Sequence, residues 1–526
     1  MEGLAEMNAG KRQPGPELVF GLVGALGADL DLVEKLLKDE LEAVGYTTVG
    51  IRLSTLLHAT KAWTGKVEDK LDAYIEQHQK VGNLFASEMK RADALALLAI
   101  NEIRKVRKEK GGDPDRPQER HAYILRQLKR PGEVTTLREV YGDAFFLVAA
   151  YSPRQSRSEE LKQKIAENYH EPSMKEKYEP KVSELINRDQ VEVDQYGVDE
   201  FGQNVRDTFP QADVFLAVSK DQQGLLPGHV KRFIELLFGY PFHTPTREEY
   251  VMFHAKAASV RSADLSRQVG AVIATDDGEV VAVGTNEVPK VGIKPEFGGQ
   301  LGGQYWYPDQ PDHRDFTLKK DQSRERKKDT VAELLARLED WFIPKIKDLP
   351  QEQRIEEALQ LIRGTQLMNI GEFGRTVHAE MAALLDAARR GASVCGLILY
   401  TTTFPCQNCA KHIIASGISQ VIYMEPYPKS YANVLHADEI VEGRAYVSGK
   451  ISFASFIGIA PRQYLRLFSM ISRKTADGKI PDWHASKRES IPRYPAATTF
   501  LAYVPREKTA AGLLKGFLKE GANLFG

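Results

Sequence analysis

Cysteine is scarce in this 526-residue chain, which contains only Cys395, Cys406 and Cys409. So few cysteines cannot build a disulfide framework, and we therefore expect a reducing, cytoplasmic setting. No apolar run approaches the roughly 20 residues that a membrane-spanning helix needs, so no membrane partner is expected. The first residues also lack the apolar core of a secretory signal. The net charge of −1 argues against a general electrostatic attraction to nucleic acid.

The first part of the chain alternates short apolar runs with amphipathic stretches. Residues 1–16 are rich in Gly, Pro and Lys and are expected to form a flexible lead-in. Residues 17–242 are expected to form the first domain, with strands near residues 18–23, 47–53, 121–125, 144–149 and 212–218. Strands that alternate with helices predict a parallel α/β sheet covered on both faces.

A second pattern predicts another α/β domain over residues 246–473. A helix over 248–262 precedes two strands joined by Asp276-Asp277-Gly278, which is a hairpin signal. An insertion of about 290–370 interrupts this domain and is expected to become helical from Thr330. Two helices, each followed by a strand, complete the domain, and Cys395 is expected to be a small buried core residue there. The tail over 474–526 shows no chemistry in its sequence.

Three residues of the second domain form a ligand set for Zn²⁺. His378 supplies one imidazole, and Cys406 and Cys409 supply two thiolates. The cysteines stand at i and i+3 at a predicted helix start, so both sulfurs can point to one side. Three protein ligands leave the fourth tetrahedral position for water, as in catalytic zinc sites.

Glu380 follows His378 closely enough to act as the acid and base for that water. The pattern H-x-E followed by P-C-x-x-C is the signature of zinc nucleobase deaminases. A purely structural zinc is the alternative interpretation, but it would need a fourth protein ligand, and none is evident nearby. The isolated histidines His254, His412 and His436 are more typical of helix surfaces or cores.

The second domain resembles the deoxycytidylate deaminase branch of the cytidine deaminase superfamily. The resemblance rests on residues 261–273, on Gly284-Thr285-Asn286, on His378-Ala379-Glu380, and on residues 405–418. It implies a cytidine-deaminase-like α/β/α fold and hydrolytic deamination of deoxycytidine nucleotides. It further implies that Asn286 contacts the sugar or base and that the Ala379 backbone contacts the cytosine.

The first domain resembles P-loop nucleotide kinases in the positions of Gly21, Gly24 and Gly27, a possible nucleotide loop. The resemblance is incomplete, because Asp29-Leu30-Asp31 stands where Gly-Lys-Ser would follow. The phosphate-binding lysine and the magnesium-binding hydroxyl are therefore missing. We interpret this domain as a degenerate kinase-like scaffold or a changed nucleotide sensor. Alternatively, the glycines serve only a tight turn.

The order of the two domains resembles the bacterial antiphage dCTP deaminases, and residues 129–134 and 202–209 fit this likeness. The resemblance implies conversion of dCTP to dUTP, and of dCMP to dUMP, which depletes the dCTP pool that a phage needs. We expect a homo-oligomer, because related deaminases build sites at subunit contacts. Since an enzyme that destroys dCTP endangers its host, an inhibitory RNA or protein regulator is also hypothesised.

Two other functions fit parts of the sequence. A polynucleotide deaminase acting on RNA or single-stranded DNA would need a basic channel. Its candidate residues lie in the insertion, at Arg314, Lys319, Lys320, Arg324, Arg326, Lys327 and Lys328. A non-catalytic nucleotide-sensing regulator is the other alternative, against which the complete zinc set argues. Candidates for binding the substrate phosphate are Arg261, Arg267 and Lys290.

Overall fold

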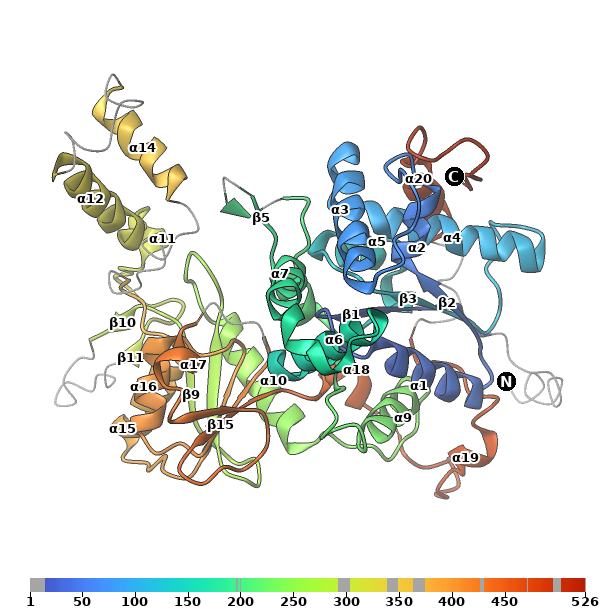
Figure 1. Cartoon of the computed structure of the whole chain (residues 1–526). Helices are drawn as coiled ribbons and strands as arrows, with labels where there is room; N and C mark the ends of the chain where they lie inside the picture. Colours follow the sequence, from blue (N-terminus) through green and yellow to red (C-terminus); the bar gives the residue numbers. More distant parts are fainter. Residues whose placement is uncertain are drawn as a thin grey trace. The chain divides into compact units, whose positions relative to one another are not determined.

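The computed structural model divides the chain into two compact units (Figure 1). It describes residues 15–194, 197–198, 200–291, 303–337, 349–362, 374–425, 430–470, 472–494 and 503–525. The first unit comprises residues 1–192, 200–246 and 457–526, and the second comprises 193–199 and 247–456. Residues 1–14 of the expected lead-in lie outside the described residues.

The first unit is built on a six-stranded sheet in the order β16-β7-β4-β1-β3-β2. Five of its strands are parallel, which confirms the predicted parallel α/β sheet, and only β16 runs antiparallel, beside β7. The strands are β1 (Leu18–Gly24), β2 (Thr47–Arg52), β3 (His121–Arg126), β4 (Phe145–Tyr151), β7 (Val214–Ala217) and β16 (Gly458–Ile459).

Alternating residues of the central strands enter different cores. Leu18, Phe20 and Leu22 of β1 pack with the apolar faces of α1 (Leu30–Ala43) and α9 (Leu226–Leu237). Val19 and Val23 are equally buried, as is most of α4 (Ala94–Gly111). Both faces of β1 are therefore covered, and this accounts for its continuous apolar run.

The remaining helices of the first unit connect or flank these strands. They are α2 (Leu53–Leu56), α3 (Leu71–Met89), α5 (Pro131–Tyr141), α6 (Arg154–Asn168), α7 (Glu179–Gln190), α8 (Val205–Thr208), α18 (Pro461–Phe468), α19 (Trp483–Ser486) and α20 (Val504–Gly512). Short 3₁₀ helices are η3 (Leu57–Ala59), η4 (Gly142–Ala144), η5 (Pro172–Tyr178) and η6 (Phe209–Gln211).

The expected domain boundary at residue 473 differs from the structure, in which the second unit ends at residue 456. Residues 457–473 belong to the first unit because β16 adds to its sheet and Leu467 enters its core. The C-terminal tail belongs there as well. Glu507 of α20 forms a buried ion pair with Arg107 of α4, at 2.6 Å.

The second unit contains a six-stranded mixed sheet in the order β14-β15-β13-β12-β8-β9. Its strands are β8 (Gly270–Ala274), β9 (Val280–Thr285), β12 (Ile398–Thr401), β13 (Gln420–Tyr423), β14 (Ile440–Glu442) and β15 (Ile451–Ser455). The predicted hairpin is confirmed: β8 and β9 pair antiparallel, and Gly278 takes a φ of +84° in the turn. The strands β12, β13, β15 and β14 run parallel to one another.

Helices α10 (Arg247–Val260), α15 (Ala379–Arg390) and α16 (Gln407–Ala415) pack on this sheet, and α17 (Ala432–Leu435) follows β13. In the insertion the described elements are β10 (Pro289–Lys290), β11 (Gly303–Gln304), α11 (Asp315–Leu318), α12 (Gln322–Arg337) and α14 (Gln351–Leu361). The helix expected from Thr330 thus begins earlier, at Gln322. Two short strands, β5 (Val193–Asp194) and β6 (Gly197–Val198), pair antiparallel. None of the described helices is long and apolar enough to span a membrane.

Candidate active site

Two helix starts in the second unit hold the predicted zinc ligands. His378 is the N-cap residue of α15, and Cys406 is the N-cap residue of α16. The sulfur of Cys406 accepts a hydrogen bond from the backbone N–H of Cys409 at 3.4 Å, so the cysteine pair is fixed within one helical turn. Because both helices pack on the same sheet, these three side chains converge although 28 residues separate His378 from Cys406.

The three side chains form a compact set of donor atoms. The Nδ1 atom of His378 lies 3.3 Å from the Sγ atom of Cys406 and 3.4 Å from that of Cys409. In a tetrahedral site with Zn–S bonds of about 2.3 Å and Zn–N bonds of about 2.0 Å, sulfur and nitrogen ligands lie roughly 3.5 Å apart. The donor set therefore fits a zinc ion in both its chemistry and its spacing.

A thiolate at Cys406 dominates the electrostatics of these three groups, and its hydrogen bond raises the pKa of His378 to about 9. The pKa of Cys406 is lowered to about 4 because its sulfur accepts hydrogen bonds from Cys409 and from His378. The pKa of Cys409 is raised by its contact with Cys406 and by burial. One thiolate thus holds the neighbouring thiol protonated, and a coordinated metal cation would deprotonate both.

Glu380 lies beside this set in the first turn of α15. Its side chain is only 3% exposed, and its Oε2 atom accepts a hydrogen bond from the Cys409 thiol at 3.4 Å. Burial raises the pKa of the Glu380 carboxyl. The structure thus brings together all four residues that the sequence singled out for zinc and for proton transfer.

Gly284 of β9 permits α15 to approach the sheet closely. A β-carbon at this position would lie 2.1 Å from the carbonyl oxygen of Ala379 and 2.3 Å from the backbone nitrogen of Ala383. Any larger residue would therefore push the first turn of α15 away from β9. Since that turn carries His378 and Glu380, Gly284 sets the position of both.

Asn286 follows β9 and fixes the loop of residues 262–269. Its Oδ1 atom accepts a hydrogen bond from the Val269 backbone N–H, and its Nδ2 atom donates to the Arg267 carbonyl, both at 2.7 Å. The described residues thus show Asn286 as a residue that shapes the loop. These two bonds use one N–H and one oxygen lone pair of the amide, so a second N–H and a second lone pair remain available for other hydrogen bonds.

Two acidic residues near His378 were not singled out in the sequence. Asp264 accepts a hydrogen bond from the Thr376 hydroxyl at 2.9 Å and another from the Ser266 backbone N–H. Glu287 pairs backbone to backbone with Val377, directly before His378. The Thr376 contact joins the loop of residues 262–269 to the segment that leads into α15, and the Val377 pairing joins the residues after β9 to the same segment. No sequence signal identifies such contacts, because they join segments about a hundred residues apart.

Each candidate for the substrate phosphate already has a partner in this structure. Arg267 forms an ion pair with Glu425, and Lys290 forms one with Asp309 at 3.0 Å. The Arg261 guanidinium lies over the Trp306 ring at 4.0 Å from its centre. An incoming phosphate would therefore have to compete for these cations.

The glycines expected in a nucleotide loop occupy different environments in the first unit. Gly21 lies within β1, where a β-carbon would come within 2.6 Å of Leu128. Gly24 ends β1. Gly27 lies in the loop before α1 with a φ of +91°, which favours glycine. Strand packing therefore accounts for Gly21, and turn geometry accounts for Gly27.

Cys395, expected in the core, is exposed. It precedes β12 and lies next to Gly417 at the turn that follows α16. Burial was expected because Cys395 lies in the apolar run of residues 394–399. The last residues of this run belong to β12, whereas the first ones form a turn at the end of the sheet.

Comparison with known proteins now identifies this unit. Residues 245–425 match the family model described as the cytidine and deoxycytidylate deaminase zinc-binding region. A segment of 139 residues is 30% identical to ComE operon protein 2 of Bacillus subtilis, covering 26% of this chain and 69% of that protein. The chain belongs to the cytidine and deoxycytidylate deaminase family.

A phage relative matches a shorter segment of the chain. The deoxycytidylate deaminase of enterobacteria phage T2 is 48% identical over 54 residues, which are 10% of this chain and 29% of the phage protein. The match thus spans less than a third of that relative. A crystal structure of dCMP deaminase from the cyanophage S-TIM5 is 16% identical, with a TM-score of 0.22 over 41% of this chain and all of that one. All three candidate zinc ligands and Glu380 fall inside the residues that the family model matches.

Proposed function

We propose that this chain is a zinc-dependent hydrolytic deaminase that acts on deoxycytidine nucleotides, both dCTP and dCMP, and yields the corresponding deoxyuridine nucleotides. The observation that carries this proposal is the convergence of His378, Cys406 and Cys409 beside the buried carboxyl of Glu380. The similarity to deoxycytidylate deaminases over the matched segment supports the substrate class.

Zinc bound to these three ligands supplies Lewis acidity that lowers the pKa of a water molecule. Glu380 is placed to accept one proton of the attacking water on its Oε2 atom and to deliver it to N3 of the cytosine. In the overall reaction the water oxygen bonds to C4 and the bond from C4 to the exocyclic nitrogen breaks. The second water proton leaves with that nitrogen as ammonia, and the base becomes uracil.

Burial of Glu380 serves this role. A carboxyl that is shielded from solvent holds its proton more tightly than an exposed one, because the charged form loses hydration. A group that must both accept and release a proton works best when neither form is strongly favoured. The Oε2 atom of Glu380 lies 3.4 Å from the Cys409 sulfur, so the carboxyl is already placed beside the proposed zinc ligands.

Substrate placement is assigned to backbone and amide groups around the zinc ligands. The buried Ala379, between His378 and Glu380, would present its backbone to the cytosine. Asn286 would use the remaining N–H of its amide for the sugar or base, while it continues to hold the loop of residues 262–269. We further propose that the reaction depletes dCTP during phage infection, within a homo-oligomer restrained by an RNA or protein.

One basic residue of the insertion, Arg314, is withdrawn from the solvent by an acidic partner. Arg314 is only 9% exposed and pairs with Asp312 at 2.7 Å. Arg324 and Arg326 lie near Glu356 and Asp329. A channel for RNA or single-stranded DNA needs cations that face the solvent along one path. Arg314 therefore does not offer its charge to a polynucleotide, whereas Arg324 and Arg326 are mostly exposed, and the assay with an oligonucleotide decides between the two substrates.

The test uses the purified, zinc-loaded chain with dCMP, dCTP, deoxycytidine and a cytosine-containing DNA oligonucleotide. We expect ammonia release with dCMP and dCTP that exceeds the release with the oligonucleotide. Release from the oligonucleotide alone would support the polynucleotide alternative. Binding of nucleotides without any release of ammonia would support the non-catalytic regulator.

A further inference from the structure

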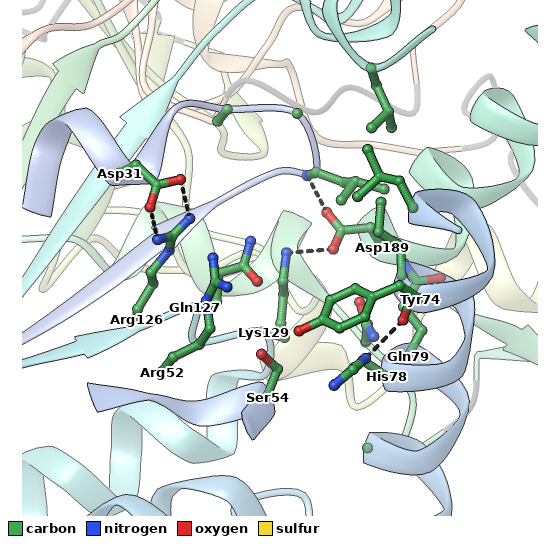
Figure 2. Close-up of a pocket in the computed structure, with 18 of the residues that line it drawn as sticks. Asp31, Arg52, Ser54, Tyr74, His78, Gln79, Arg126, Gln127, Lys129 and Asp189 are labelled. Carbon is green, nitrogen blue, oxygen red and sulfur yellow. Dashed lines mark hydrogen bonds and ion pairs between the residues drawn. The ribbon is translucent and has the colours of Figure 1, made fainter. Parts of the chain in front are cut away.

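Cations and carboxylates stand together in a cavity of the first unit. The cavity has a volume of about 290 Å³ and lies beside the loop that follows β1, where Arg126 pairs with Asp31 at 2.7 Å (Figure 2). Two further cations of its lining, Arg52 and Lys164, occur together with the carboxylates of Asp29 and Glu160. The ion pairs of the second unit differ, because they connect segments of chain that lead to the proposed zinc site.

Glu287 is a buried carboxylate at which three segments of the second unit meet. Its Oε2 atom accepts a hydrogen bond from the Ala263 backbone N–H at 3.1 Å and lies 3.5 Å from the Nη1 atom of Arg314. Its backbone N–H donates to the Val377 carbonyl at 3.2 Å, and the Val377 N–H donates back at 3.0 Å. One residue therefore contacts the loop that contains Ala263, the insertion, and the residue directly before the N-cap of α15.

Arg314 brings the insertion to this carboxylate. Its guanidinium donates two hydrogen bonds to Asp312, at 3.0 and 2.7 Å, and lies over the Phe316 ring at 4.8 Å from its centre. The hydrogen bond from Arg314 lowers the pKa of Asp312 to about 2, so both groups are charged at neutral pH. A largely buried cation needs anionic partners, since an unpaired charge inside a protein is costly. Asp312 and Glu287 together meet that need.

A second ion pair joins the same piece of the insertion to the segment that leads into α15. Arg375 belongs to that segment, and its Nη1 atom donates to the Asp315 carboxylate at 2.8 Å and to the His313 carbonyl at 3.0 Å. Residues 312–315 of the insertion therefore contact both of the segments that pair with each other, the one that follows β9 and the one that enters α15.

The pairing between these two segments is short. Glu287 and Val377 form an isolated bridge with one backbone hydrogen bond in each direction, and no longer ladder surrounds it among the described residues. The ion pairs from the insertion therefore reinforce a weak junction. Because Val377 directly precedes His378, a shift of this junction moves a proposed zinc ligand. A displacement of about 1 Å at a reacting centre can cost about a hundredfold in rate.

We propose that Glu287 is a positioning residue of the deaminase site and that Arg314 of the insertion fixes it in place. This inference rests on the proposed function, because it concerns the same site. Glu287 acts through Val377 on the proposed zinc ligand, and through the Ala263 N–H on the loop that Asn286 shapes. The insertion thus supports the geometry of the site from outside the set of zinc ligands.

The experiment compares Glu287→Gln, Arg314→Gln and the double variant that carries both, each in the full-length, zinc-loaded chain. The Glu287→Gln variant keeps the shape of the side chain and an oxygen for the Ala263 N–H, but it loses the charge opposite Arg314. Arg314→Lys is the conservative variant, which keeps the cation. The matched control is Arg247→Gln/Asp277→Asn, which removes an exposed ion pair of the same unit at 3.0 Å.

Two quantities are measured per folded, zinc-containing chain: the rate of dCMP deamination and the rate at which a chelator removes zinc. We expect each single glutamine variant to lower kcat/KM by about ten- to a hundredfold, with the larger change in kcat because a zinc ligand is displaced. Zinc release should become about tenfold faster. The double variant should lose no more than the worse single variant, because loss of either partner already breaks the pair. Arg314→Lys should recover part of the lost rate, since it keeps the charge but not the bidentate geometry.

Both rates equal to those of the control in the two single variants would overturn the proposal. So would a double variant whose loss equals the product of the two single losses, because the two residues would then act independently. If Arg314→Gln does not fold, Glu287→Gln and Arg314→Lys decide the question by the same two rates. If the unaltered chain releases no ammonia, the proposed function fails, whereas the rate of zinc release still decides whether Glu287 and Arg314 position the site.

Discussion

Gly284 faces Ala379 so closely that a β-carbon at residue 284 would lie 2.1 Å from the Ala379 carbonyl oxygen. This contact joins β9 to the first turn of α15, which carries His378 and Glu380. Two segments nearly a hundred residues apart are thereby brought into one site. The position of the proposed zinc ligand His378 thus depends on a glycine in a strand that contributes no ligand of its own.

Substitution Gly284→Ala should displace α15 and weaken zinc binding. Overpacking of this kind costs typically 1–3 kcal/mol, and we expect the zinc content per chain and the deaminase rate to fall together. Metal analysis of the purified variant checks this result. The control is Gly228→Ala in α9, where a β-carbon meets nothing within 4 Å. Full zinc content in the Gly284→Ala variant would show that the close approach is not needed.

Removal of one zinc ligand should abolish stoichiometric metal binding. For Cys406→Ala we expect less than about a tenth of the zinc that the unaltered chain retains after dialysis, because two ligands cannot close the site. Cys395 offers a matched control, since it is an exposed cysteine in the same unit. The Cys395→Ala variant should keep its zinc, and a loss of zinc from both variants would contradict the ligand assignment.

Replacement of the proposed acid and base should separate chemistry from metal binding. The Glu380→Gln variant keeps the shape of the side chain but cannot accept the proton, and we expect kcat to fall by about 10²- to 10⁴-fold. Zinc content should stay the same, because Glu380 is not among the ligands. Steady-state ammonia release together with metal analysis measures both quantities. A variant with full rate would show that another group moves the proton.

Asn286→Ala should release the loop of residues 262–269, since two hydrogen bonds to Val269 and Arg267 are lost. Each such bond contributes about 0.5–1.5 kcal/mol. We expect a fall in kcat/KM with zinc retained. The substitution Leu265→Ala provides a control on the same loop, because this side chain is exposed and forms no hydrogen bond. If both variants behave like the unaltered chain, the loop does not contribute to substrate binding.

The buried ion pair between Arg107 and Glu507 should make the C-terminal helix α20 essential to the first unit. Arg107 is fully buried and also pairs with Glu17 at 2.7 Å. Loss of one partner from a buried pair costs about 3–5 kcal/mol, so Glu507→Ala should lower the unfolding midpoint of this unit strongly. Lys508→Ala removes the adjacent exposed charge and should change stability by less than about 1 kcal/mol. Urea unfolding compares the two variants.

The sequence alone predicted the residues of the proposed zinc site. His378, Glu380, Cys406 and Cys409 were predicted from residue type and local spacing. For the two cysteines, a helix start places residues i and i+3 on one side whatever surrounds it. Parallel α/β architecture in the first unit also followed from local patterns, since strands buried on both faces are continuously apolar.

Tertiary structure alone decided which distant segments meet. In the structure, residues 457–526 belong to the first unit and Cys395 is exposed to solvent. Asn286 forms a hydrogen bond with the backbone of a loop. Tertiary structure also set the Asp189 carboxylate against the loop after β1 and opened a cavity beside it. None of this can be inferred from local periodicity, because each contact joins residues far apart in the chain and depends on how whole elements pack.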